Sequence, residues 1–395
     1  MKFNWQTKRL GEVCCISAGN SAPQKKEFFI DGKYPFFRTS DVGSTHIGKI
    51  TNSNDRLNEK GIKGLKLFEK GTILLPKSGA STFLNHRVIL GTDGYVSSHL
   101  ATIKTDEKIL NNNYLFYFLQ EIKAQDLIQD HKYPSLNLPV IGGIEISYPE
   151  SIPEQKRIVK ILHEAFEKIE KAKENAEKNL QNAKELFESY LQSVFSNSKH
   201  EKKSLGTICK IIGGGTPSKA GSNFAKFYNG NILWATVRDM KNDIIMDTEH
   251  KITEDAVKKS STNIIPKNNV VIASRVGLGK ICFLKNDTAI NQDLRGIIPL
   301  NLNNLSVNYL FWWFKSIAKI IIQNGSGATV HGVKLPFIKS LEISFPPLTE
   351  QKSIVAKLDA LSAETKRLEA IYQQKLTDLE ELKKSMLNKA LSGKL

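Results

Sequence analysis

The feature that most constrains this chain is an internal repeat that extends over most of its 395 residues. The segment Lys8–Cys14 recurs as Lys203–Cys209, and Asn113–Phe116 recurs as Asn308–Phe311, both with an offset of 195 residues. Three further pairs of similar segments keep this register to within two residues: 144–149 with 341–346, 154–159 with 350–355, and 191–196 with 387–392. A period of about half the chain predicts two similar structural halves.

Each half begins with a globular part and ends with a long helical part. Short apolar and β-branched runs such as Gly71–Pro76 and Asn269–Ser274 are bounded by Gly, Pro or Asn, which is typical of strands between turns. Single helices are expected around Asn113–Gln129 and Val307–Gln323. This mixture predicts a mixed α/β domain in each half and leaves the order of its strands open.

The long helical parts have the clearer pattern. From Pro153 to about Phe195 the chain has no internal Pro or Gly, and apolar residues recur at steps of three and four. Pro153 and the pair Thr349 and Glu350 are typical of helix N-termini. At ~1.5 Å per residue each helix is about 60 Å long. The predicted seam consists of Ile158, Leu162, Ile169, Leu180, Phe187, Val194, Ile354, Leu358, Leu361, Leu368, Leu379, Leu382 and Met386.

An apolar stripe of about forty residues is too long for one globular part to cover. We therefore expect the two long helices to pair with each other as an antiparallel coiled coil, because the first must lead away from domain one and the second begins at domain two. The resulting fold is α/β, with two similar mixed α/β domains separated by two long antiparallel helices and related by a pseudo-two-fold internal repeat. The predicted boundaries are 1–152 and 198–347 for the domains, and 153–197 and 348–395 for the helices.

The charge points to nucleic acid. The chain has 56 Lys and Arg against 40 Asp and Glu, and its net charge of +16 is concentrated in the globular parts. Excess Lys and Arg gain affinity for phosphates through the release of condensed counterions. Two similar basic domains held apart by helices would read a bipartite target, on DNA whose helical turn is ~34 Å.

The sequence lacks the motifs of the common catalytic sites. The Gly-rich stretches Ile211–Lys219 and Gly277–Lys280 lack the Gly-Lys-Ser/Thr end of a phosphate-binding loop, and we interpret them as turns in which Gly supplies a positive φ. The motifs of amino-methyltransferases and metal-dependent nucleases are also missing. The four cysteines have no Cys-x-x-Cys spacing and are expected to be buried free thiols. We therefore expect a chain without catalytic residues, metal or cofactor of its own.

The N-terminal residues lack the apolar stretch of a secretion signal. The most apolar run, Tyr309–Ile322, is interrupted by Lys315 and Lys319 and is too short to span a bilayer. A soluble, cytoplasmic protein without membrane contact is expected.

Three segments together carry a family resemblance: Pro346–Val355, with its Glu-Gln-Lys-x-Ile-Val helix start, Leu205–Ser218, with Gly-Gly-Thr-Pro, and the terminal Ala390–Leu395. With the repeat of domain and helix, they closely resemble the DNA specificity subunit of type I restriction-modification systems. The first half departs from the pattern, since Gly19–Pro23 replaces Gly-Gly-Thr-Pro and Ser151–Pro153 replaces the Pro-Leu-x that precedes Glu-Gln.

The resemblance implies a non-catalytic subunit whose two target recognition domains each read one half of a split site on double-stranded DNA. It also implies that the helices dock two methyltransferase (modification) subunits and that the assembly recruits two restriction subunits. S-adenosylmethionine, ATP and Mg would then be bound by those partners. The alternative is a coiled-coil scaffold without sequence-specific DNA binding, and an enzyme is the third hypothesis.

Most protein–DNA hydrogen bonds go to phosphate and sugar, so most DNA-facing basic residues should position the duplex and a few polar residues should read bases. The candidates are Lys25, Lys26, Arg38, Lys77, Ser78, Asn85 and Arg87 in domain one, and Lys219, Arg238, Lys241, Arg275, Lys280, Arg295 and Lys334 in domain two. Arg38 and Arg238 each lie near a repeat-related aspartate, Asp41 or Asp239, and a structural Arg–Asp pair explains them equally well. The aromatic run Phe311–Phe314 is interpreted as helix core.

Overall fold

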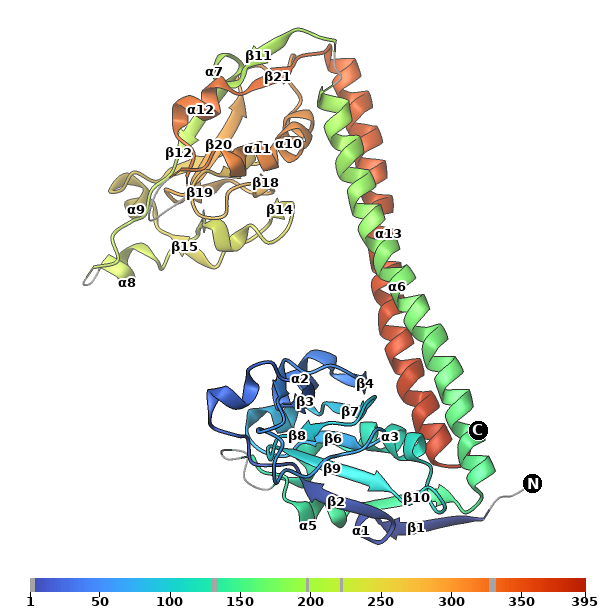
Figure 1. The fold of residues 1–395 in the computed structure, drawn as a ribbon. Helices are drawn as coiled ribbons and strands as arrows, with labels where there is room; N and C mark the ends of the chain where they lie inside the picture. The colour runs from blue at the N-terminus through green and yellow to red at the C-terminus, as the bar shows by residue number, and fades with distance from the viewer. Residues whose placement is uncertain (1–3, 129–131, 133, 197–198, 221–222, 327–331) are drawn as a thin grey trace. The chain divides into compact units, whose positions relative to one another are not determined.

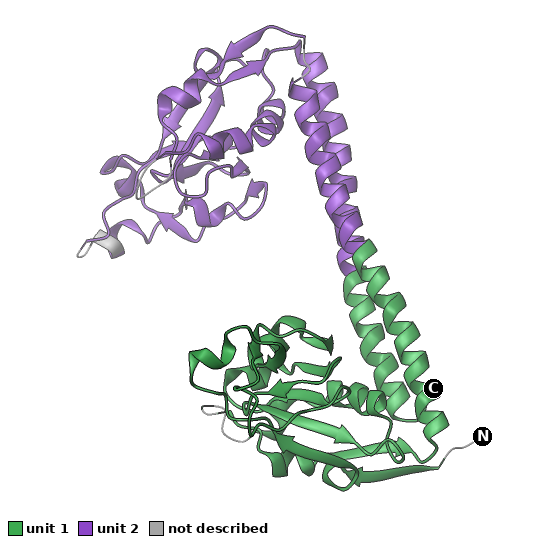
Figure 2. Cartoon of the chain, viewed as in Figure 1, with its two compact units in different colours: residues 1–175, 375–395 green, residues 176–374 purple. Residues whose placement is uncertain are grey.

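The computed structural model describes residues 4–128, 132, 134–196, 199–220, 223–326 and 332–395 (Figure 1). The chain forms two compact units, Met1–Asn175 with Lys375–Leu395, and Ala176–Gln374 (Figure 2). Each unit contains one globular domain and parts of both long helices, α6 (Ile152–Ser196) and α13 (Leu348–Leu391). Below, the two are called unit 1 and unit 2.

The central five-stranded sheet has the same order in both units. In unit 1 the order is β2 (Cys14–Ala18), β9 (Leu100–Thr105), β6 (Ile73–Pro76), β7 (Arg87–Leu90) and β4 (Ile47–Ile50). In unit 2 it is β12 (Cys209–Gly213), β20 (Leu294–Pro299), β17 (Val270–Ala273), β18 (Ile281–Leu284) and β14 (Ile244–Ile245). The edge strand β4 or β14 is parallel to its neighbour, and the other pairs are antiparallel.

The smaller sheets also repeat. Unit 1 has β5 (Asp55–Leu57), β3 (Tyr34–Phe37) and β8 (Tyr95–Val96), and unit 2 has β15 (His250–Ile252), β13 (Ile232–Ala235), β19 (Thr288–Ile290) and β16 (Asn263–Ile265). A separate ribbon pairs β1 (Trp5–Arg9) with β10 (Glu145–Pro149), and its counterpart pairs β11 (Lys202–Ser204) with β21 (Glu342–Ser344). The predicted repeat and the mixed α/β fold of each half are confirmed.

Short helices connect the strands. In chain order they are α1 (Leu10–Val13), η1 (Lys26–Phe29), α2 (Thr39–Thr45), η2 (Ala80–Leu84), α3 (Asn112–Glu121), α4 (Ala124–Leu127), α5 (Leu138–Gly142), α7 (Leu205–Ile208), α8 (Asn223–Phe227), η3 (Val237–Asp239), α9 (Glu254–Lys258), α10 (Val307–Ser316), α11 (Ala318–Gln323) and α12 (Leu335–Ser340), the η elements being 3₁₀ helices.

The helices expected as single elements around 113–129 and 307–323 are each broken. The break between α3 and α4 occurs at Ile122, whose backbone is extended, and the break between α10 and α11 occurs at Ile317. The run Phe311–Phe314 lies within α10 with all four side chains buried, so its interpretation as helix core is confirmed.

The long helices pack antiparallel within each unit. In unit 1, Ile158 and Leu162 of α6 share one apolar core with Leu387 and Ala390 of α13, and further along α6 the Lys173 ammonium lies 2.5 Å from Glu380. Rising residue numbers on α6 therefore meet falling numbers on α13. In unit 2 a separate apolar core likewise contains residues of both long helices. These are Leu191 and Phe195 of α6, and Val355 and Leu358 of α13.

The seam differs from the predicted one at Leu382, which is 47% exposed, so that prediction is wrong. The neighbouring Lys383 occupies the interface instead, with its ammonium 5.3 Å from the centroid of the Phe166 ring and 4.0 Å from Glu170. A lysine can fill such a position because its methylene chain packs against apolar groups while its charge reaches the edge. The other predicted seam residues are buried or half-buried.

A buried glutamine fastens the start of α6 to the domain of unit 1. Gln155 is fully buried, and its Oε1 accepts a hydrogen bond from the backbone N of Asn111 at 2.7 Å. Its Nε2 donates to the carbonyls of Ile109 and Pro149 at 3.1 and 2.8 Å. These three bonds join α6, the loop before α3 and the end of β10.

Gln351 does the same for α13 in unit 2. It is also fully buried, accepts from the backbone N of Ser306 at 2.8 Å, and donates to the carbonyls of Asn304 and Pro346 at 2.8 and 2.9 Å. The Glu-Gln pair at the start of each long helix therefore contains one residue that fixes the helix to its domain.

Glycine is required at these positions for two different reasons. Gly277 has a φ of +75°, as predicted for a turn. Gly214 does not have a positive φ, so the predicted reason is wrong there: a Cβ at Gly214 would lie 2.1 Å from the carbonyl oxygen of Ile290. Gly19 is in the same situation, 2.3 Å from the oxygen of Ser97. Close approach of two backbones requires glycine at both positions.

We predict that Gln351→Ala lowers the free energy of unfolding of unit 2 by about 3 kcal/mol, because it leaves three buried backbone groups without partners. Urea unfolding followed by tryptophan fluorescence suits this test, since Trp234, Trp312 and Trp313 all lie in unit 2. The exposed neighbour Lys352 provides the control, and Lys352→Ala should change stability by less than about 0.5 kcal/mol. Equal stability of the two variants would contradict the role of Gln351.

Candidate nucleic-acid interface

In unit 2, loops from several strands meet at one end of the central sheet. The backbone N of Ser274 donates to Asp293 O at 2.8 Å, and the N of Val333 donates to Ser274 O at 2.8 Å. Lys280 Nζ lies 3.4 Å from Val237 O. We call this surface the loop edge of unit 2; it comprises residues 213–219, 236–239, 274–280, 291–295 and 332–334.

Unit 1 has the same arrangement. The backbone N of Lys77 donates to His99 O at 3.0 Å, and the N of Leu136 donates to Lys77 O at 2.8 Å, which repeats the pattern of unit 2. The N of Ser97 donates to Phe37 O at 2.9 Å. The loop edge of unit 1 comprises residues 18–26, 38–41, 77–85, 97–99 and 134–136.

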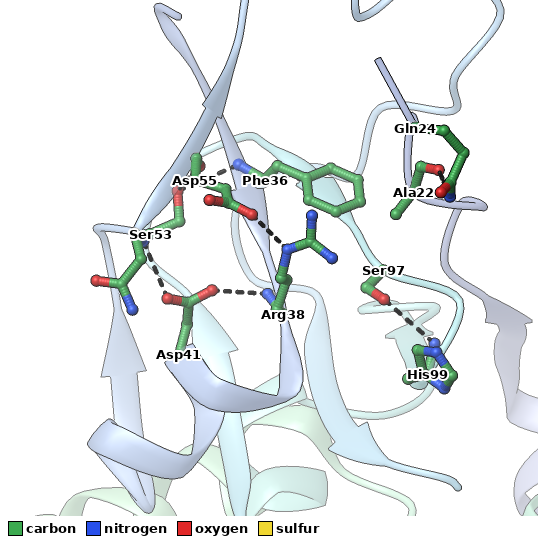
Figure 3. A network of polar contacts seen from close by, with 10 residues as sticks. Ala22, Gln24, Phe36, Arg38, Asp41, Ser53, Asp55, Ser97 and His99 are labelled. Carbon is green, nitrogen blue, oxygen red and sulfur yellow. Dashed lines mark hydrogen bonds and ion pairs between the residues drawn. The ribbon is translucent and has the colours of Figure 1, made fainter. Parts of the chain in front are cut away.

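An aspartate holds the same turn in both loop edges. Asp41 accepts from the backbone N of Arg38 at 2.7 Å and from that of Asn54 at 3.0 Å (Figure 3). Asp239 accepts from the backbone N of Thr236 at 2.7 Å. The two aspartates are therefore structural equivalents, and the residue that corresponds to Arg38 is Thr236.

The two arginines singled out from the sequence are not equivalent. The guanidinium of Arg38 pairs with Asp55, both side chains being about one-third exposed, and lies 5.1 Å from the centroid of the Phe36 ring (Figure 3). Its ion-pair partner is thus Asp55, while Asp41 binds backbone. Arg238 is 83% exposed, with Nη1 3.9 Å from Glu249. Arg238 presents its charge to solvent, whereas Arg38 is held in place.

A pair of guanidinium groups lies on the loop edge of unit 2. Arg275 is exposed, with Nε 3.6 Å from Oδ1 of Asp293. Arg295 is half-buried and donates from Nη1 to the carbonyls of Gln292 and Leu294 at 3.3 and 3.0 Å. The pKa of Arg295 is lowered, mainly because its guanidinium is partly buried and also because the charge of Arg275 is nearby. A nearby phosphate would relieve the repulsion between these two like charges.

Lys219 lies over an aromatic surface on the same edge. Its ammonium is 5.1 Å from the centroid of the Tyr228 ring and 5.9 Å from that of Trp234, which favours one position of a long, exposed side chain. Tyr228 in turn donates its hydroxyl to Pro217 O at 2.8 Å. The remaining predicted residues of unit 2 are exposed: Lys241, Lys280 and Lys334.

In unit 1, Lys25 and Lys26 are exposed at the start of η1, and Lys77 and Ser78 are half-buried. Asn85 has a structural role, because its Oδ1 accepts from the backbone N of Ala124 at 2.7 Å and its φ is +55°. The structure therefore brings most of the predicted residues of each domain to its loop edge, and gives Asn85 a function in joining η2 to α4.

Arg87 is a correction, because it is 1% exposed and has no surface with which to reach DNA. It donates from Nη1 to His86 O at 2.8 Å and from Nη2 to Ile122 O at 3.2 Å, and burial lowers its pKa to about 10. Its guanidinium satisfies the carbonyl that the break between α3 and α4 leaves free. The sequence shows only a basic residue beside a loop, which does not reveal that Arg87 is buried at a helix break.

Chemistry of other kinds is limited in the described part of the chain. No group of three or more His, Cys, Asp or Glu in that part could hold a metal ion. The cysteines are free; Cys209 and Cys282 are buried as expected, Cys14 is half-buried, and Cys15 is exposed, contrary to expectation. Among the described ranges no helix is both long and apolar enough to cross a membrane.

Residues 3–178 and 197–378 match the family model described as the type I restriction modification DNA specificity domain. The chain belongs to this specificity family. It is 32% identical over 259 residues to the EcoR124I/EcoR124II specificity subunit of Escherichia coli, a match that spans 62% of each protein. It is 23% identical to the MjaVIII specificity subunit of Methanocaldococcus jannaschii, covering 99% of this chain and 93% of that protein.

Solved structures of the specificity family have the same fold. One, from a study of complex assembly and conformational transition of the type I R-M system, covers the whole of both chains with a TM-score of 0.81 and 19% identity. The HsdS subunit from Thermoanaerobacter tengcongensis has a TM-score of 0.64 and 18% identity, and the match covers 99% of this chain and 97% of that one.

Sequence reasoning missed two polar residues on the loop edges of this specificity-family chain. His99 is exposed, with Nδ1 2.9 Å from the Oγ of Ser78. Gln292 is exposed and bonds to Thr216. His99 occupies the position of Asp293, which is not among the predicted candidates, so comparing the two halves gives no signal for it.

We predict that Arg87→Ala lowers the free energy of unfolding of unit 1 by about 2 kcal/mol, through the cavity that it leaves and the loss of a partner for Ile122 O. Urea unfolding measured by circular dichroism tests this, with Lys60→Ala as the control, because Lys60 is exposed and is not among the proposed DNA-facing residues. Unchanged stability combined with weaker DNA binding would instead support Arg87 as a DNA contact.

Proposed function

We propose that this chain is the DNA specificity subunit of a type I restriction-modification complex, and that each loop edge reads one half of a bipartite target. The observation that carries the proposal is that one backbone frame is built twice with different side chains. Ser78 and His99 in unit 1 take the places of Arg275 and Asp293 in unit 2. Two like frames with unlike side chains would dock alike on a duplex and read different bases.

The proposed DNA-facing residues are the predicted ones whose side chains are exposed or half-buried, without Asn85, whose side chain binds the backbone of Ala124. Lysines supply point charges for phosphates, while exposed arginines and amides can form paired hydrogen bonds with base edges. The set retained is Lys25, Lys26, Arg38, Lys77 and Ser78 in unit 1, and Lys219, Arg238, Lys241, Arg275, Lys280, Arg295 and Lys334 in unit 2. Gln292 and His99 are added as polar readers.

In this proposal residues 1–152 and 198–347 are the target recognition domains, and the helices 153–197 and 348–395 space them. The helices would also dock two methyltransferase subunits, and the assembly would include two restriction subunits. Methylation and ATP-dependent cleavage would belong to those partners, which would bind S-adenosylmethionine, ATP and Mg. The chain itself would be non-catalytic and would act in the cytoplasm.

The direct test is to co-express the chain with the neighbouring modification subunit and to map adenine methylation in the host genome. The expected result is a single split motif, methylated once in each half. A stable complex that produces no motif and no sequence-selective footprint would overturn the proposal and favour a coiled-coil scaffold.

We predict that Arg275→Ala weakens binding of the assembled complex to its motif about tenfold, corresponding to one lost base or phosphate contact of about 1–3 kcal/mol. A mobility shift at low salt measures this. The control is Lys285→Ala, an exposed lysine at the end of β18 away from the loop edge, which should bind like the unaltered complex. Unchanged affinity of Arg275→Ala would contradict its assignment.

A further inference from the structure

Unit 1 contains an open cleft of about 900 Å³ that the loop edge does not include. It lies among the edge strand β4, the start of α3 and the first turns of α6. Its charged and titratable lining residues are Lys49, Lys70, Lys156, Lys160, His163, Glu107 and Tyr117. Four lysines face one carboxylate, so the cleft is strongly positive.

The charges of the cleft are poorly compensated. Lys160 lies 4.0 Å from Glu164, one turn along α6, and both side chains are largely exposed. For Lys49, Lys70 and Lys156 no ion pair is present among the described residues, and all three are exposed. Like charges that line a concave surface reinforce one another and concentrate anions there.

The repeat shows that the fold does not require all of this charge. The registers of β4 with β7 and of β14 with β18 place Ile244 at the position of Lys49. The paired glutamines align the long helices, so that Ala356 takes the place of Lys160 and Asp359 that of His163. Unit 2 therefore has apolar or acidic residues at the positions of Lys49, Lys160 and His163, while Lys267 and Lys352 keep a lysine at the positions of Lys70 and Lys156.

We propose that this cleft binds phosphates of the duplex DNA that flanks the half-site read by unit 1. This inference rests on the proposed function. Lysine is a point-charge ligand for phosphate, and the cleft is lined by four lysines and by no arginine. Protein interfaces, in contrast, are depleted in lysine and enriched in arginine and aromatic residues. The aromatic residues in the lining are Phe116, which is buried, and Tyr117, which is half-buried. An acidic protein segment is therefore the less favoured occupant.

The position of the cleft within unit 1 suits flanking DNA. Gly71, which lines the cleft, and Lys77, on the loop edge, lie at opposite ends of β6. Six residues at ~3.3 Å each separate them by about 20 Å, which corresponds to about six base pairs at ~3.4 Å. The cleft would therefore contact the backbone about half a turn from the bases that are read, without contributing to sequence selectivity.

The test is the double variant K49A/K70A, which leaves both long helices unaltered, in complex with the modification subunit. Binding is measured by mobility shift over a range of salt concentrations, on DNA with the methylated motif and on a scrambled duplex. The plot of log affinity against log salt should become less steep by about two, since each lost phosphate contact removes about 0.9 from the magnitude of its slope. Affinity for the two duplexes should fall by the same factor.

The matched control is Lys267→Ala, because Lys267 is the exposed counterpart of Lys70 in unit 2, and it should leave the slope unchanged. Specific binding with an unchanged slope in K49A/K70A would overturn the cleft proposal alone. So would an intact slope combined with loss of the modification subunit on gel filtration, which would identify a protein contact. A complex of the unaltered chain that selects no sequence would overturn the proposed function instead.

Discussion

The structure depends on two buried side-chain amides, Gln155 and Gln351. Each has a carbonyl oxygen and an amino group that meet three backbone groups from a long helix, a loop and a strand end. An apolar residue of the same size would leave those groups unpaired in the interior. Because the bonds fix the direction in which each helix leaves its domain, the orientation of each loop edge relative to its own helix follows from them.

A second constraint separates the frame from the side chains that it displays. Asp41 and Asp239 bind backbone, and Gly19 and Gly214 permit close approach of strands, so these residues cannot vary freely. Exposed positions such as Arg275 contribute little to the core and can change without loss of the fold. Such a division permits one architecture to display different chemical surfaces, as the basic cleft of unit 1 also does.

The sequence was sufficient to predict the repeat, the long helices and the mixed α/β domains, because those depend on periodic patterns and on long-range register. Strand order could not be predicted, since it depends on pairings between residues far apart in the chain. The loop edges were predicted in part: exposed lysines such as Lys219 lie there, but Arg87 is buried because a helix break needs a donor. Leu382 shows that a regular apolar stripe does not fix which residues lie in the helix interface, because the neighbouring Lys383 takes that place while Leu382 is exposed.

The composition of unit 1 has a consequence for synthesis on the ribosome. Its apolar core includes Leu387 and Ala390, which follow unit 2 in the chain, whereas unit 2 is the continuous segment Ala176–Gln374. Unit 2 can therefore complete its core while the chain is still being extended, although translation usually favours N-terminal domains. Unit 1 must wait for Lys375–Leu395, so its first 175 residues remain incompletely packed until unit 2 has been made.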